Sequence, residues 1–249
     1  MVEPPGPLIT VVIALRNDAK ALNNTLASMV GQESVERTLV LIIDSNSLDA
    51  PIDIVHKYED RVSIEFCTGY DSGIYNAWNK ALKLVRTPWL TFFGAGDTFC
   101  EYALTKLITH IVEDPPVDIV SSRSRNIYSP THHVIGGKPF RMEEFCRHFT
   151  VNHSGLLYRR EVFNSYGNFD ERYRSSGDYD FLVRIGSRVR FDFLDAIVSN
   201  YLVGGISSRS LMPIRETYQV RRRHGLASRW SNYAQFARAA TAYYMSRWR

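Results

Sequence analysis

The stretch at residues 70–99, YDSGIYNAWNKALKLVRTPWLTFFGAGDTF, decides the fold. It begins with a turn at residues 71–73, whose Asp, Ser and Gly suit a tight bend. Apolar residues then recur at three- and four-residue spacing over residues 74–85, which predicts a helix that a Thr-Pro pair ends. Residues 89–93 form a short aromatic run typical of a buried strand. Asp97 follows that strand, at the edge where open α/β sheets bind ligands.

The rest of the chain repeats this alternation of strand and helix. The pattern predicts strands at residues 8–15, 38–43, 62–66, 118–121, 154–158, 189–194 and 196–202, with a hairpin at 126–138. It predicts helices at residues 19–30, 52–58, 102–112, 142–148, 160–166 and 178–185, and from 212 onward. Such alternation indicates an α/β fold with a mainly parallel sheet flanked by helices.

The overall composition is that of a globular protein. The chain has 249 residues, 45% hydrophobic and 22% charged, which fits one large α/β domain or one domain with an appendage. Its three cysteines form no C-x-x-C motif, which favours reduced thiols over a zinc site or disulfides. We see neither a basic leader nor a stretch of about 18 apolar residues, so we expect a cytoplasmic location.

The segment DSGIYNAWNKAL, followed by a strand and GAGD, resembles the core of glycosyltransferase family 2. The matching residues are Asp71, Gly73, Ile74, Tyr75, Ala77, Asn79 and Lys80. The sequence departs from the family pattern at Asn76, Trp78 and Gly96, the last being where many members have a second acid. The resemblance covers residues 8–207. It implies a Rossmann-like GT-A fold and an inverting, metal-dependent glycosyltransferase of the bacterial polysaccharide type.

The resemblance also implies a donor site. Asp44 would hydrogen-bond the base or ribose of a nucleotide-diphosphate sugar, Asp71 would contact the nucleotide, and Asp97 would ligate Mg²⁺ or Mn²⁺. Strand alternation places these three carboxylates on one sheet edge, so we expect a metal, Lys80 or a ligand to compensate their charge. The other residues expected at the nucleotide sugar are Ala14, Arg16, Ser47, Gly73, Asn79, Lys80, Gly96, His153, Arg184, Gly205 and Ser207.

A second motif, SSGDYDFLVR at residues 175–184, carries the candidate base. Asp180 and Arg184 are four residues apart and should pair along the helix, which leaves Asp178 as the freer carboxylate. By the resemblance, Asp178 is the general base, although a carboxylate in a first helical turn can also serve only as a cap. Arg184 is expected to orient the loop.

Two smaller features have two interpretations each, and a third has one. His153 either touches the donor sugar or acceptor, or is a satisfied buried histidine. The glycine pair at residues 204–205 either approaches phosphate closely or forms a plain turn. His132 and His133 have no partner at metal-ligand spacing and are expected to be exposed in the hairpin.

The end of the chain is basic and aromatic. The net charge is +4, and arginines dominate after residue 212. This composition suits an anionic membrane surface, aromatic packing on the domain or, least favoured, nucleic acid. We expect a GT-A domain at residues 1–211, with a nucleotide-binding half at 8–121 and an acceptor half at 122–211, and a helical tail at 212–249.

The sequence therefore predicts transfer of a sugar to a glycan or lipid-linked acceptor, in polysaccharide or glycolipid synthesis. The tail adds the expectation of peripheral binding to the inner face of the cell membrane. Two alternatives remain: a sugar nucleotidyltransferase, whose Gly-rich loop is missing at residues 14–18, and a non-catalytic, membrane-docking module derived from a transferase.

Overall fold

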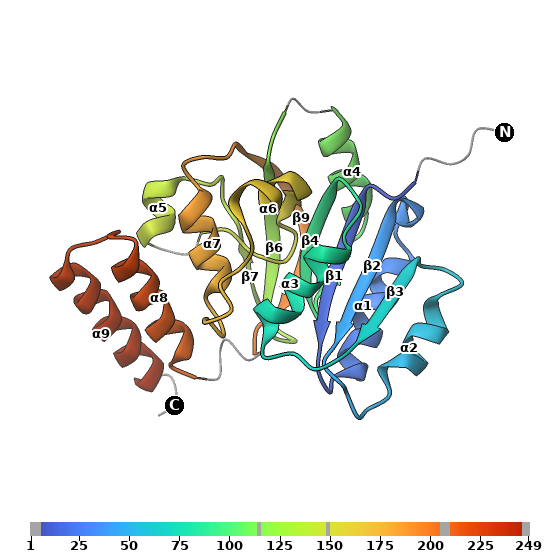
Figure 1. Ribbon diagram of the computed structural model, residues 1–249, viewed down its shortest axis with the longest axis horizontal. Helices are drawn as coiled ribbons and strands as arrows, with labels where there is room; N and C mark the ends of the chain where they lie inside the picture. The colour runs from blue at the N-terminus through green and yellow to red at the C-terminus, as the bar shows by residue number, and fades with distance from the viewer. Residues whose placement is uncertain (1–5, 114–115, 148–149, 205–209, 246–249) are drawn as a thin grey trace.

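The computed structural model describes residues 6–113, 116–147, 150–204 and 210–245. In these residues nine strands form one sheet in the order β3-β2-β1-β4-β8-β6-β9-β5, with β7 beside β6 (Figure 1). The strands are β1 Ile9–Leu15, β2 Thr38–Asp44, β3 Ile64–Thr68, β4 Trp89–Gly94, β5 Thr98–Phe99, β6 Ile119–Ser129, β7 His132–Gly136, β8 Leu157–Arg159 and β9 Phe191–Leu202.

Helices pack on both faces of this sheet (Figure 1). Their bounds are α1 Ala19–Val30, α2 Pro51–Tyr58, α3 Ile74–Leu84, α4 Ala103–Glu113, α5 Met142–Arg147, α6 Arg160–Tyr166, α7 Gly177–Ile185, α8 Met212–Arg223 and α9 Arg229–Met245, with a 3-10 turn at Val35–Arg37. The predicted α/β architecture is confirmed.

The first half of the sheet is parallel. β1 pairs with β2 and β4, and β2 pairs with β3, all in parallel register. Leu15 lies opposite Asp44, and Ala14 lies opposite both Ile43 and Gly94, so these strands end together. The loops that follow β2 and β4 therefore lie at the same edge.

The second half of the sheet is mixed. β8 runs antiparallel to both β4 and β6 and joins the two halves, while β6 and β9 are parallel. β8 begins later than the sequence pattern predicts because Gly155 has a φ of +93°, which is not a strand conformation. The two strands predicted at 189–202 are one strand, β9, with an irregular register opposite Arg123.

Side-chain alternation in the buried strands produces two hydrophobic cores. Val12, Leu41 and Ile43 face a core that includes α3, α6 and α7. The intervening residues, among them Val11 and Ile42, face a second core with α1, α2 and α4. Strands with both faces buried have nearly continuous apolar sequences, as expected for parallel sheets.

The C-terminal helices α8 and α9 form a hairpin beside α7 (Figure 1). Val220 of α8 is fully buried in the α7 core. Arg221 donates to the Tyr179 hydroxyl at 3.3 Å and to the carbonyl oxygen of Arg147. His224 lies 2.9 Å from Asp180. Packing on the domain is therefore the role that these contacts support for α8.

Removal of one aromatic ring from α7 tests how tightly the core between α6 and α7 is packed. Phe181 is fully buried, and its ring stacks on Phe163 at 4.8 Å. We expect Phe181→Ala to lower the unfolding free energy by about 3–5 kcal/mol, because a ring is lost and a cavity forms. Val112 is 65% exposed, so Val112→Ala should change it by less than about 0.5 kcal/mol. Urea denaturation of both variants measures the difference, and equal costs would contradict the packing described.

Candidate functional site

The predicted strand-end carboxylates lie at one edge of the sheet. Asp44 ends β2, and its Oδ2 accepts hydrogen bonds from the Ser47 N–H at 3.1 Å and the Thr68 hydroxyl at 3.0 Å. Its Oδ1 is buried and has no hydrogen-bond partner among the described residues. A buried acceptor without a donor is costly, so a ligand hydroxyl or N–H would stabilise it.

Asp71 pairs with Lys80, one of the three compensating groups that the sequence leaves open. The Lys80 Nζ lies 2.5 Å from Asp71 Oδ1 and also donates to the Tyr70 carbonyl oxygen. Only 4% of the Asp71 side chain is exposed, and in the described part of the chain its Oδ2 has no hydrogen-bond partner. The Lys80 ammonium thus stands at the same sheet edge as the acceptor groups.

Asp97 accepts hydrogen bonds from the end of β4, the segment before β8 and the end of β9. Its Oδ2 accepts from the Gly94 N–H at 3.2 Å and from the Ser154 hydroxyl, and its Oδ1 accepts from the Leu202 N–H at 3.3 Å. No ion pair to Asp97 occurs within the described ranges. Burial raises the pKa of Asp97 from 3.8 to about 6, although these hydrogen bonds oppose the shift. A cation at Asp97 would relieve this uncompensated charge.

The backbone conformation at residue 96 favours glycine over the second acid that many family members have there. Gly96 has a φ of +98°, and its N–H donates to the Thr25 hydroxyl at 2.9 Å. Glycine adopts this conformation without the strain that a side chain would introduce. Within the part of the chain described, no three His, Cys, Asp or Glu side chains cluster around a common metal position. One carboxylate still fits Mg²⁺ or Mn²⁺ when a diphosphate and water supply the other oxygen ligands.

Asp178 lies in the first turn of α7 and contacts α3. The Tyr75 hydroxyl donates to Asp178 Oδ1 at 3.0 Å. Burial and the Asp178 charge raise the pKa of Tyr75 well above its usual value, so this phenol remains a donor. Glycine at 177 permits the contact, because a Cβ there would lie 2.8 Å from the Tyr75 ring.

His153 is stacked in an aromatic cluster beside the candidate base. Its ring packs on Trp78 at 4.8 Å and on Phe92 at 5.7 Å. Its Nδ1 lies 3.8 Å from Asp178 Oδ2, beyond hydrogen-bond distance. Burial lowers the pKa of His153 while Asp178 raises it, with a net decrease, so the ring is neutral at pH 7. Its buried nitrogens have no hydrogen-bond partner among the described residues, unlike those of a satisfied histidine.

Asn79 and Arg184 bind protein groups rather than facing the strand-end carboxylates. The Asn79 amide bonds to the backbone of Phe169 and to Glu171. Arg184 donates to the carbonyl oxygens of Tyr166 and Asn168, which agrees with the expected loop-orienting role. It lies 4.0 Å from Asp180, the pair that the sequence predicts.

The remaining predicted residues are distributed around the edge. Ala14 is the last residue of β1 that pairs with β4, and Arg16 is exposed just beyond the strand. The Ser47 hydroxyl accepts from the Asn17 N–H at 2.7 Å, and Gly73 lies against the Arg174 side chain. Gly205 and Ser207 lie outside the described residues.

Sequence reasoning assigned no role to Tyr75, although the matched motif contains it, and none to Ser154. Their contacts join residues that are 103 and 57 positions apart, which spacing does not reveal. His132 and His133 are exposed in β7, as predicted.

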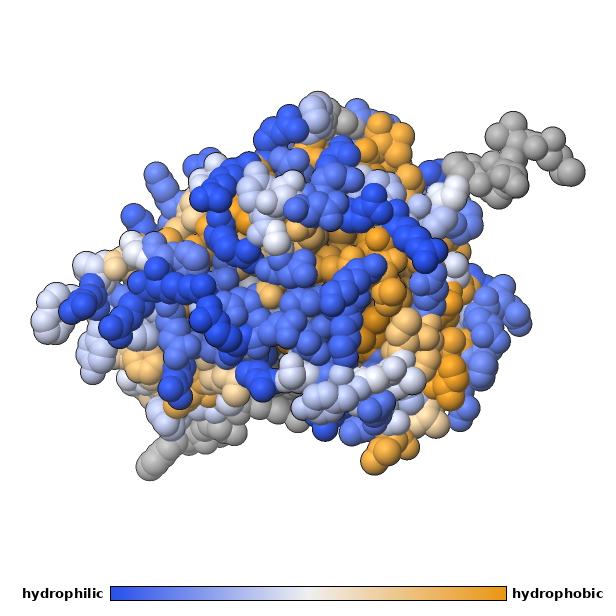
Figure 2. Space-filling view, viewed as in Figure 1, coloured by the Kyte–Doolittle hydropathy of each residue, from blue (hydrophilic) through white to orange (hydrophobic). Residues whose placement is uncertain are grey.

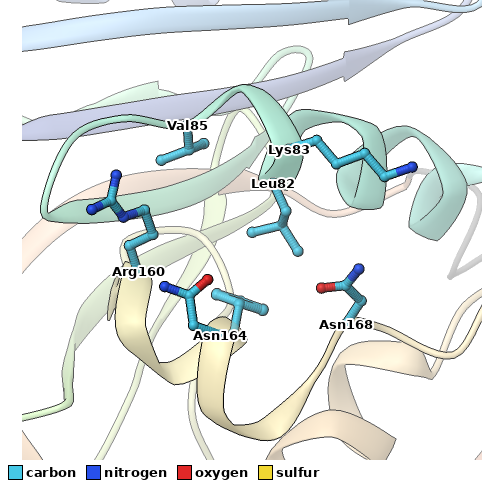
Figure 3. A pocket seen from close by; sticks show the side chains of 7 residues that line it. Leu82, Lys83, Val85, Arg160, Asn164 and Asn168 are labelled. Atoms are coloured by element: carbon cyan, nitrogen blue, oxygen red, sulfur yellow. The ribbon is translucent and has the colours of Figure 1, made fainter.

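A cavity of about 400 Å³ lies between the C-terminal end of α3 and α6 (Figure 3). It is lined by Leu82, Lys83, Val85, Arg160, Phe163, Asn164 and Asn168. None of these residues belongs to the strand-end set, so the candidate site is identified by its carboxylates and not by this cavity.

Carboxylates gathered at the carboxyl edge of a largely parallel sheet are typical of α/β proteins that bind ligands there. Residues 10–167 match the family model described as Glycosyl transferase family 2. The chain belongs to that family and is a glycosyltransferase. A PGL/p-HBAD biosynthesis glycosyltransferase of Mycobacterium bovis (strain BCG / Pasteur 1173P2) is 28% identical over 211 residues, which cover 82% of this chain and 80% of the relative.

Solved structures confirm the GT-A fold. The S. aureus TarS 1-349 complex with UDP-GlcNAc superimposes with a TM-score of 0.70 at 18% identity, covering 87% of this chain and 65% of TarS 1-349. The mannosyltransferase PcManGT from Pyrobaculum calidifontis, in complex with GDP-Man and Mn²⁺, superimposes with a TM-score of 0.63 at 14% identity. The match covers 96% of this chain and 75% of PcManGT. The present chain thus spans about two thirds of TarS 1-349.

The raised pKa of Asp97 predicts a pH-dependent stability. Between about pH 4 and pH 6 the folded protein keeps a proton on Asp97 that the unfolded chain has released. The unfolding free energy should therefore fall as the pH rises through this window, by about 3 kcal/mol for this group. Asp97→Ala lacks the group and should lose less stability over the same window. Urea denaturation at pH 4 and pH 7 measures both changes, and parallel pH profiles would contradict the assignment.

Proposed function

We propose that this glycosyltransferase is inverting and metal-dependent, and that it moves a sugar from a nucleotide-diphosphate sugar to an acceptor hydroxyl. One observation carries the proposal. His153 and Ser154 are adjacent, and His153 lies beside Asp178 while Ser154 bonds to Asp97. The candidate base and the candidate metal ligand are therefore close together across one short segment, at the edge that also bears Asp44 and Asp71.

In the proposed reaction Asp178 accepts the proton of the acceptor hydroxyl. The acceptor oxygen then attacks the anomeric carbon from the side opposite the diphosphate, and the bond to the diphosphate breaks. The Tyr75 hydroxyl and the α7 dipole orient and stabilise the Asp178 carboxylate before it takes the proton. A bound Mg²⁺ or Mn²⁺ at Asp97 would supply electrostatic stabilisation of the leaving diphosphate. Lys80 is the protein cation proposed to assist there.

The donor contacts proposed for this site are those of the strand-end set. Asp44 and Asp71 would accept hydrogen bonds from the nucleotide, since each has a buried oxygen without a partner among the described residues. Structural neighbours hold UDP-GlcNAc and GDP-Man, which supports a nucleotide-sugar donor. The proposed acceptor is a glycan or a lipid-linked sugar, as the sequence resemblance implies, and a relative is named as a PGL/p-HBAD biosynthesis glycosyltransferase.

Asp178→Asn tests the base. The substitution keeps the side-chain shape and removes the proton acceptor, so turnover should fall by at least ~10²-fold. Donor affinity should change little, because the group acts in the transition state. Steady-state kinetics on the fastest nucleotide sugar from a panel of UDP- and GDP-sugars measures both values. Near-normal turnover would exclude Asp178 as the base.

Asp97→Ala tests the metal. Isothermal titration of UDP and GDP, with and without Mn²⁺, should show metal-enhanced binding by the unchanged protein and none by the variant. Binding should also weaken below about pH 6, because a proton competes with the metal for the carboxylate. Asp118→Ala removes an acid outside the site and serves as the control. Equal Mn²⁺ enhancement in both variants would refute the assignment.

We also propose that α9 brings the enzyme to an anionic membrane. Trp230, Tyr233 and Tyr244 are 84%, 59% and 56% exposed, and their spacing places them on one helix face. Arg229 and Arg238 on the same helix are exposed too. Figure 2 shows a mostly hydrophilic surface over α7 and α8 on the side that it draws, and the exposed aromatic side chains of the tail lie on α9. No helix in the described ranges combines the length and apolar character needed to cross a bilayer.

Vesicle flotation tests the proposed membrane contact. At low salt the full chain should float with anionic vesicles, and high salt should release it, since each arginine near the surface contributes about 1 kcal/mol of screened attraction. Trp230→Ala combined with Arg238→Ala should weaken flotation without lowering the melting temperature. Truncation before Arg221 is unsuitable, because Arg221 bonds to the domain. Failure of the full chain to float at low salt would end the membrane proposal.

A further inference from the structure

The backbone immediately before α7 is bound by a carboxylate from α8. Glu216 Oε1 accepts the Arg174 N–H at 2.8 Å. Its Oε2 accepts the N–H groups of Ser175 and Ser176 at 2.8 and 2.9 Å. Three successive amides therefore converge on one side chain, two residues before Asp178.

This carboxylate is placed where its hydrogen bonds are strong. Glu216 is only 7% exposed. Hydrogen bonds from amides to an ionised acceptor are about twice as strong as neutral ones. The positive end of the α7 dipole lies in the same region and favours a negative charge there. No salt bridge to Glu216 occurs in the described part of the chain, so its charge is stabilised by these amides.

The same segment contacts the donor-side loop on its other side. The Arg174 side chain packs against Gly73, and a Cβ added to Gly73 would lie only 2.6 Å from the Arg174 Nη1. A Cβ added to Gly177 would lie 2.8 Å from the Tyr75 ring. Residues 174–177 are thus enclosed between α8 and residues 73–75. A shift of this segment would move Asp178 relative to Tyr75.

α8 is itself fixed to α7, so it can serve as a support. The Ser176 hydroxyl donates to the Pro213 carbonyl oxygen at 3.3 Å. Further along α8, Arg221 bonds to Tyr179 and His224 bonds to Asp180. These contacts bind both ends of α8 to the helix that carries the candidate base.

We propose that Glu216 is a positioning residue for catalysis: it fixes the backbone of residues 174–176 and thereby holds Asp178 in place for proton transfer. This inference rests on the proposed function, in which Asp178 is the base. It gives the first turn of the tail helix a role in the reaction, separate from any role of α9.

Glu216→Gln tests the proposal in the full chain. The amide replaces one acceptor oxygen with an NH₂ group that faces backbone donors, so at least one of the three bonds is lost. We expect kcat to fall at least 10-fold while the dissociation constant of UDP or GDP with Mn²⁺ changes less than 3-fold. Hydrogen exchange should accelerate at residues 174–178 and not in the first half of the sheet. Glu216→Asp, which keeps the charge but shortens the reach, should give a smaller loss and remains informative if the first variant does not fold.

Asp118→Asn is the matched control, because Asp118 accepts the Arg190 N–H at 2.8 Å in a loop outside the site. It should leave kcat within 2-fold. Unchanged kcat in both Glu216 variants would overturn the proposal, as would a loss of kcat equal to that of Asp118→Asn. Failure of the base assignment can be distinguished from failure of the positioning proposal. If Asp178→Asn keeps normal turnover while Glu216→Gln loses it, Asp178 is not the base, and Glu216 positions another group of the segment.

Discussion

The hydrogen bonds to Asp97 connect the two halves of the molecule. This carboxylate accepts hydrogen bonds from the end of β4, the segment before β8 and the end of β9, through Gly94, Ser154 and Leu202. The parallel half of the sheet and the mixed half therefore meet at one buried acid. Its charge opposes burial, and its raised pKa records that conflict. The structure tolerates this cost at a position where a cation would stabilise it, which is typical of functional sites.

Residue types and spacing predict the parallel half of the fold well. Continuous apolar runs around β1, β2 and β4 correspond to strands buried on both faces, and the helix α1 has the predicted bounds. The strand-end location of Asp44, Asp71 and Asp97 also follows from the sequence, because parallel strands bring their carboxyl ends to one edge. The sequence leaves a metal, Lys80 or a ligand open as the compensating group, and the structure pairs Lys80 with Asp71.

What the sequence could not show are contacts between distant segments. The antiparallel insertion of β8 between β4 and β6 depends on tertiary packing and on the conformation of Gly155. The bond from Tyr75 to Asp178 and the bonds from residues 174–176 to Glu216 have no sequence period to reveal them. For the arginine-rich tail, composition alone does not distinguish the bonded Arg221 of α8 from the exposed surface of α9.

The anomeric configuration of the first-formed product tests the central claim most directly. In the absence of an acceptor, water takes its place, and ¹H NMR can follow an α-linked donor such as UDP-GlcNAc or GDP-mannose with Mn²⁺ and the full chain. Direct displacement with Asp178 as base predicts that the β-anomer of the released sugar appears first and that mutarotation follows. First appearance of the α-anomer would contradict single displacement at this site.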